Sequence, residues 1–107
     1  MAGFNTSRIL AILSRNKGFL LLERGFPQGD LKGDILIARR SDGTQLTGRD
    51  EYGHVVPVPV GQVHLEDFLR ASLIALDDDE STVERQVYRL TAEGARRGLE
   101  VAAADGE

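Results

Sequence analysis

Two short apolar segments, separated by a polar acidic stretch, constrain this chain more than any other feature. The segments are residues 73–76 and 87–90, and the acidic block between them is residues 77–80. Short apolar runs on either side of a polar loop are typical of paired strands, so the pattern predicts a β-hairpin. A helix is expected after the second segment, from Ala92 to Ala103.

An amphipathic helix is expected directly before this hairpin. From Val63 onward, Leu65, Phe68 and Leu69 fall on one helical face, and most of the polar residues fall on the other. The C-terminal half of the chain therefore has the predicted order helix, strand, loop, strand, helix.

This order resembles the end of a winged-helix domain of the MarR/PadR regulator type. In that family a recognition helix leads into a β-hairpin, the wing, and a Leu-Thr-x-x-Gly segment opens the next helix. Here that segment is Leu90, Thr91 and Gly94, and Thr91 resembles the N-cap of the last helix. The resemblance covers roughly residues 63–98. The whole order of helix, strands, helix, wing and short helix is also similar to small variants such as the YjhX-like family of toxin-like proteins.

The N-terminal half predicts one helix followed by strands. Asn5, Thr6 and Ser7 can cap a helix that begins near Ser7, and residues 19–22 favour a short buried strand. The glycine-rich stretch 25–34 indicates a loop. Residues 34–40 and 44–47 then predict a hairpin around the turn 41–43.

Two prolines set the expectation for the segment that follows. Residues 49–53 predict a further turn, and residues 54–60 predict an extended chain at an edge or outside any sheet. With the resemblance, these elements predict an α+β, winged-helix-like domain with an additional N-terminal β-hairpin. We expect a single domain over residues 1–100 and a flexible tail over residues 101–107.

The resemblance implies double-stranded DNA as a partner, met by the recognition helix and the wing, in a transcription regulator that forms a dimer. The segments that it brings to DNA are the helix from Val63, the wing and the start of the last helix. The residues implied are His64, Arg70, Thr82, Arg85, Gln86, Arg89, Arg96 and Arg97.

The acidic residues of the same segments support a second hypothesis, a protein-interaction module that binds a basic protein partner. Inhibitors and adaptors from phage, mobile elements or toxin–antitoxin systems can have this size. The acidic surface would comprise Glu66, Asp67, Asp77, Asp78, Asp79 and Glu80. The arrangement of charge distinguishes the two hypotheses. DNA binding is favoured if the arginines share one face and the acids point away from it, and a protein partner is favoured if the acids dominate that face. The net charge of −4 disfavours non-specific nucleic-acid coating.

The sequence has no motif for catalysis or for a cofactor. There is no cysteine, and the two histidines do not have the spacing of metal ligands. We interpret Asp50, Glu51 and His54 as a solvated turn, and we expect no metal site, cofactor or enzymatic activity. No segment has the length of a membrane helix or the pattern of a secretory signal, so we expect a cytoplasmic protein without membrane contact.

One further group of basic residues has two interpretations. Arg39 and Arg40 lie together on the hairpin predicted over residues 34–47, with Arg49 and Lys17 as potential neighbours. They could form a basic patch. The alternative, which we favour, is a charged strand edge that prevents aggregation.

Overall fold

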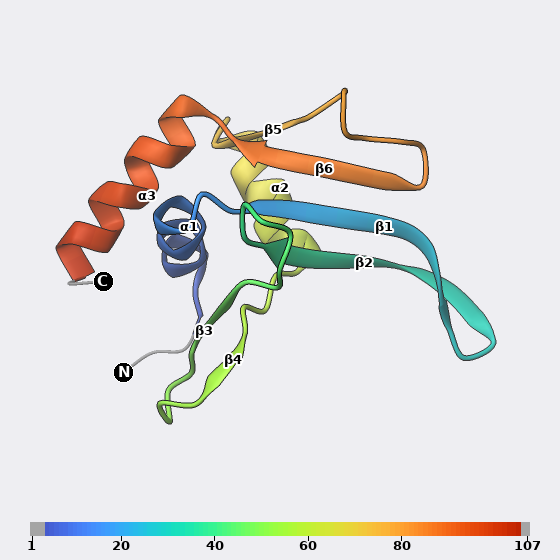
Figure 1. Ribbon diagram of the computed structural model, residues 1–107, viewed down its shortest axis with the longest axis horizontal. Coiled ribbons are helices and arrows are strands. Elements are labelled where there is room, and N and C mark those ends of the chain that lie inside the picture. The colour runs from blue at the N-terminus through green and yellow to red at the C-terminus, as the bar shows by residue number, and fades with distance from the viewer. Residues whose placement is uncertain (1–3, 106–107) are drawn as a thin grey trace.

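The computed structural model describes residues 4–105, without the side chains of 26–28, 31–32 and 105, as an α+β fold of three helices and six strands (Figure 1). The helices are α1 (Thr6–Arg15), α2 (Gln62–Arg70) and α3 (Ala92–Asp105). The strands are β1 (Phe19–Gln28), β2 (Leu31–Arg39), β3 (Thr47–Arg49), β4 (Val55–Pro57), β5 (Ile74–Leu76) and β6 (Arg85–Leu90). No helix in this part of the chain has the length and apolar character needed to cross a membrane.

The main sheet is antiparallel, with the strand order β2-β1-β6-β5. β1 therefore has a neighbour on each side: Leu21 is the partner of Ile37 in β2 and of Val87 in β6. Leu20, Leu21 and Leu22 are all buried, so these side chains are shielded from solvent although they alternate between the two faces of the sheet. A strand in this position needs a continuous apolar run, which confirms the buried strand predicted from residue 19.

One face of the sheet forms the core. Leu20 and Leu22 share a cluster with Leu65 and Phe68 of α2, which lies behind the sheet (Figure 1). α1 lies at the end of the sheet where β1 begins, and α3 packs against α1. Side chains alternate along a strand, so Leu21 and Val87 point to the other face of the sheet. We call this the open face, because no helix covers it in the described part of the chain.

The hairpin predicted in the C-terminal half is confirmed. β5 and β6 are antiparallel, with Ile74 opposite Leu90. Thr91 Oγ1 accepts a hydrogen bond from the backbone N–H of Gly94 at 3.0 Å, which confirms its capping role at the start of α3. α3 continues to Asp105 with Ala102 buried, so the chain is helical through the first five residues of the expected tail.

The predicted glycine-rich loop over residues 25–34 is wrong. β1 and β2 continue through this stretch as one long hairpin with its turn at Gly29 and Asp30. Gly25 and Gly29 both have positive φ, 68° and 65°. Gly25 lies where the pairing register shifts between Glu23 and Phe26, as at a β-bulge. The glycines therefore bend and turn the strands instead of ending them.

The hairpin predicted over residues 34–47 is formed only next to its turn, where the N–H of Arg40 donates to the oxygen of Thr44 and the N–H of Leu46 donates to that of Ala38. β3 pairs instead with β4, which forms a separate two-stranded ribbon. The additional hairpin between the first two helices exists, but β1 and β2 form it. The extended segment after the turn at residues 50–53 lies outside the main sheet, as its prolines predicted.

The contact between α1 and α3 requires a glycine at position 98. A Cβ atom there would overlap Ser14 Oγ and lie 2.7 Å from the backbone oxygen of Leu10. Helix propensity alone would make Gly98→Ala stabilising by about 1 kcal/mol. Overpacking costs about 1–3 kcal/mol and acts in the opposite direction.

We therefore expect Gly98→Ala to lower the free energy of unfolding, measured by urea titration. Ala103→Ser adds one atom at an exposed position of the same helix and should change that free energy by less than about 0.5 kcal/mol. A stabilised Gly98→Ala variant would contradict the close packing of α1 on α3.

Candidate functional sites

The predicted recognition helix presents mixed charge. Glu66 and Arg70 are exposed on α2, and Arg70 Nη1 lies 3.3 Å from Asp67 Oδ1. His64 has a local role at the start of the helix, because its Nδ1 accepts a hydrogen bond from the backbone N–H of Gly61 at 2.9 Å. Two residues of this helix, His64 and Arg70, were predicted to contact DNA. Only Arg70 is exposed, and the carboxylate of Asp67 partners it.

The predicted wing residues lie on both faces of the sheet. Arg85 and Arg89 follow the alternation of Val87 and point to the open face, whereas Gln86 points to the face that carries α2. Arg85 Nη2 lies 3.5 Å from Glu23 Oε1, and Gln86 Oε1 accepts a hydrogen bond from Arg24. The wing arginines and the outer face of α2 are therefore on opposite sides of the sheet (Figure 1).

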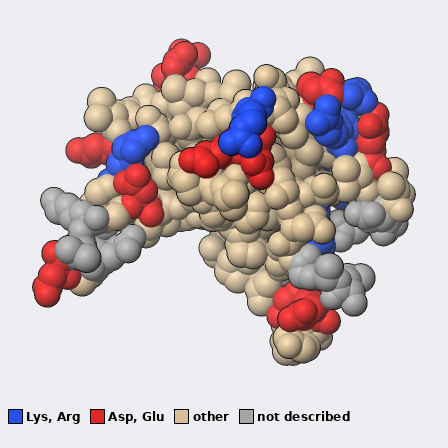
Figure 2. All heavy atoms as spheres, turned by 180° about the vertical axis from the view of Figure 1, so that it is seen from behind, with Lys and Arg blue, Asp and Glu red and all other residues tan. Residues whose placement is uncertain are grey.

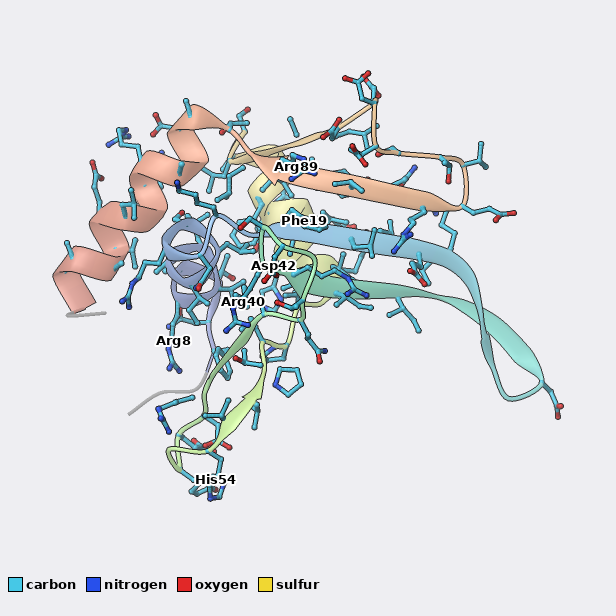
Figure 3. All side chains as sticks on the ribbon, in the orientation of Figure 1. Arg8, Phe19, Arg40, Asp42, His54 and Arg89 are labelled. Atoms are coloured by element: carbon cyan, nitrogen blue, oxygen red, sulfur yellow. The ribbon has the colours of Figure 1, made fainter. Side chains whose placement is uncertain are left out.

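Asp77 organises the acidic loop and connects it to the sheet. Arg89 Nε donates to Asp77 Oδ2 at 2.7 Å, and the backbone N–H groups of Asp79 and Glu80 donate to Asp77 Oδ1. The hydrogen bond from Arg89 is the main cause that lowers the pKa of Asp77 below its usual value. The guanidinium of Arg89 also lies 4.9 Å from the centre of the Phe19 ring on the open face (Figure 3).

The rest of this loop is exposed. Asp78, Asp79, Glu80 and Thr82 are all exposed, and Thr82 Oγ1 accepts a hydrogen bond from the backbone N–H of Arg85 at 3.2 Å. Asp77 therefore has a structural role in the loop, while the three acids that follow it present their charge to solvent.

The two arginines predicted on the last helix are paired within α3. Arg96 contacts Glu93 and Glu100, and Arg97 Nη2 lies 3.6 Å from Glu93 Oε1. The hydrogen bond from Arg96 is the main cause that lowers the pKa of Glu93, and the same contact raises the pKa of Arg96. A carboxylate thus partners each arginine that was predicted to contact DNA.

A different group of arginines surrounds a cavity of about 350 Å³ between α1 and β3, which we call the arginine pocket. α1 contributes Arg8 and Arg15, the segment after β2 contributes Arg40, and β3 contributes Arg49. Figure 3 shows Arg8 and Arg40 on the side of the molecule where α1 faces the β3–β4 ribbon. The remaining lining residues are Ile12, Asn16, Thr47 and Gly48.

Neutral oxygen atoms accept hydrogen bonds from three guanidinium groups of this pocket, those of Arg8, Arg40 and Arg49. Arg8 Nη2 donates to the backbone oxygen of Arg49 at 2.7 Å, and Arg49 Nη1 donates to that of Gly53 at 2.8 Å. Arg40 donates to the backbone oxygen of Gln45 at 2.9 Å and to Thr47 Oγ1 at 3.0 Å. Such bonds orient the groups without cancelling their charge.

The sequence indicated only part of this pocket. Arg40 and Arg49 line it, whereas Arg39 lines a hollow on the open face of the sheet and Lys17 lines another hollow beside Gly18. The sequence interpretation missed Arg8 and Arg15. Their spacing of seven residues places them on one helical face, and this was the available signal.

The acidic turn before β4 has a local structural role. Asp50 Oδ1 accepts hydrogen bonds from the backbone N–H groups of Tyr52 and His54, each at 2.9 Å. The bond from His54 is the main cause that lowers the pKa of Asp50. Within residues 4–105 no three histidine or acidic side chains are grouped so that they could hold a metal ion.

No family model, no curated protein and no solved structure matches this chain. The charge and shape of its surfaces therefore carry the functional argument. Two surfaces are distinct enough to compare: the outer face of α2 and the arginine pocket. The acidic loop does not join the outer face of α2, because Glu80 lines the hollow on the opposite face of the sheet with Arg85 and Arg89.

The role of Asp77 predicts a pH-dependent stability. A carboxylate whose pKa is lower in the folded state adds stability above its unfolded pKa, and this contribution is lost as the pH falls through the folded pKa. Asp77→Asn should therefore be less stable than the parent protein at neutral pH, with a gap that closes below the usual aspartate pKa of 3.8. Urea unfolding at a series of pH values measures both effects.

Asp78→Asn is the matched control, because it removes the same charge from an exposed neighbour that makes no hydrogen bond among the described side chains. It should show no such gap. A difference between Asp77→Asn and the parent protein that stays constant with pH would contradict the anchoring role of Asp77.

Proposed function

We propose that this chain is a protein-binding module that uses the outer face of α2. This face, which we define as Gln62, Val63, Glu66, Leu69 and Arg70, is exposed along its length. Val63 is 60 % exposed. Leu69, which the sequence placed on the apolar face with Leu65 and Phe68, is 40 % exposed, whereas those two are buried. Two large apolar side chains on one exposed helical face, next to a single acidic and a single basic group, favour a protein partner.

The pairing of the arginines is the observation that carries this proposal. A DNA-binding surface draws its affinity from cationic groups that replace the counterions of phosphates. Here carboxylates of the same chain already partner Arg70, Arg85 and Arg89. Figure 2 shows the side on which α2 lies: acidic and basic side chains are next to one another, and most of the surface between them is neutral.

The surface also defines the chemistry of its partner. The apolar side chains of α2 need an apolar groove. Asp67 is paired with Arg70, which leaves Glu66 as an acidic group on this face that makes no ion pair among the described residues. We infer a partner whose apolar groove is flanked by lysine or arginine side chains, because complementary charge accelerates and orients association.

Duplex DNA is the second candidate. The order of α2, β5, β6 and α3 matches the segment that resembles a winged-helix domain, and that scaffold most often binds DNA. The local charge supports this candidate less well, because the acidic loop would meet phosphates. The two candidates differ in how salt and arginine substitutions should act.

The test compares partner capture with DNA binding. We expect the protein to retain a stoichiometric partner, and Val63→Asp or Leu69→Asp to weaken this binding about tenfold or more, as for a buried apolar anchor. Tyr52→Asp is the control, because Tyr52 is 77 % exposed on the turn between β3 and β4, away from α2. An electrophoretic titration with duplex DNA at low salt should show no complex.

Two results would contradict the proposal. One is a DNA complex whose affinity falls steeply with salt and falls further in Arg85→Gln or Arg89→Gln, because that behaviour requires phosphate contacts. The other is a captured partner that Tyr52→Asp loses as readily as Leu69→Asp does.

A further inference from the structure

Three arginines of the arginine pocket, Arg15, Arg40 and Arg49, have no carboxylate within 4 Å among the residues that the structure describes. The guanidinium of Arg15 also makes no hydrogen bond to those residues. Elsewhere on the described surface carboxylates partner six arginines, namely Arg24, Arg70, Arg85, Arg89, Arg96 and Arg97. In a chain with an excess of acidic residues, this absence of acidic partners around one cavity is a specific feature.

The nearby acid Asp42 has other partners. The charge of Arg40 contributes to the lowered pKa of Asp42, but the main cause is the hydroxyl of Thr44. Thr44 donates to Asp42 Oδ1 from its backbone N–H at 2.9 Å and from its hydroxyl at 2.6 Å. Asp42 thus belongs to the turn after β2, and it is not among the residues that line the pocket.

The fold brings the arginines together by a close approach of β3 to α1. Arg8, Ile12 and Arg15 lie on one face of α1, at helical spacing, and Gly48 of β3 lies against that face. A Cβ atom at Gly48 would lie 2.8 Å from Phe4 Cε1 and 3.3 Å from Ile12 Cδ1. Gly48 and Ile12 therefore supply an apolar wall to the cavity that the four arginines line.

We propose that the arginine pocket binds a phosphate monoester. Planar guanidinium groups match phosphate oxygens in bidentate geometry, and several of them around one cavity suit a ligand with more than one negative charge. The cavity of about 350 Å³ falls near the lower end of the range for small-molecule sites, roughly 300–1,000 Å³. It has room for a phosphate group and a small organic group against Ile12 and Gly48.

This inference is independent of the proposed protein partner, since the pocket and the outer face of α2 have no residue in common. The phosphate can come from a free phosphate ester or from the terminal phosphate of a nucleic acid strand. Both sources present the same dianionic group to the arginines.

Titration calorimetry with phenyl phosphate and phenyl sulfate tests the chemistry. The two probes have similar shape, but phenyl sulfate carries one charge fewer above the second pKa of the phosphate, about 6. We expect one site, with phenyl phosphate binding at least tenfold more tightly than phenyl sulfate at pH 8. The preference should decrease at pH 5, where the phosphate is a monoanion.

Arg15→Gln is the decisive variant, because the side chain of Arg15 makes no hydrogen bond or ion pair with the described residues and its loss should not affect folding. It should weaken phenyl phosphate binding about tenfold, as the loss of one charged contact does. Arg97→Gln removes the same formal charge from α3 and should leave binding unchanged. Arg40→Gln is a second pocket variant, accompanied by a urea titration because Arg40 also holds Gln45 and Thr47.

A hexanucleotide with and without a 5′-phosphate distinguishes the two sources. Tighter binding of the phosphorylated strand than of phenyl phosphate identifies a strand end, and equal binding of the two identifies a free phosphate ester. The proposal is overturned if phenyl phosphate does not bind more tightly than about 1 mM. It is also overturned if Arg15→Gln binds as the parent does, or if the strand binds equally well without its phosphate.

Discussion

The structure depends on the pairing of β1 along both of its edges. Leu20, Leu21 and Leu22 are buried on the two faces of this strand, and β2 and β6 complete its hydrogen bonds. An inner strand of this kind cannot be exposed without losing both its apolar burial and its backbone pairing. The position of β1 therefore determines where the later β5–β6 hairpin lies.

This constraint changes what the hairpin can do. A wing that projects from a domain is free to enter a groove of DNA, but β6 is an inner strand between β1 and β5. Its outward-facing arginines lie on the open face of the sheet and are held by Glu23 and Asp77. The same ion pairs that stabilise the sheet thus reduce the charge available to a nucleic acid. Arg15, Arg40 and Arg49, which have no carboxylate within 4 Å among the described residues, lie instead around the cavity between α1 and β3.

The elements that were predicted correctly are those determined by residues close together in the sequence. The strand around Leu21, the β5–β6 hairpin and the Thr91 cap follow from an apolar run, a polar loop and a hydroxyl at a helix start, all of which are local signals. The hairpin of β1 and β2 was missed because Gly25 and Gly29 have the same signature whether they end a strand or bend it.

The arginine pocket was only partly predictable for a related reason. Helical spacing alone joins Arg8 to Arg15, but nothing local indicates that β3 crosses α1 at Gly48. The pairing of Arg89 with Asp77 likewise depends on the hairpin register and on the path of the acidic loop. Residue type identified these groups as candidates, whereas their partners are set by long-range packing.

The central position of β1 can be tested directly by nuclear magnetic resonance. In this register Leu21 and Val87 face each other across β1 and β6. We expect a contact between their Hα protons, and amide exchange at Leu20 and Leu22 that is as slow as global unfolding. The absence of that contact, with rapid amide exchange throughout β5 and β6, would show that the hairpin is a free ribbon and would contradict the account.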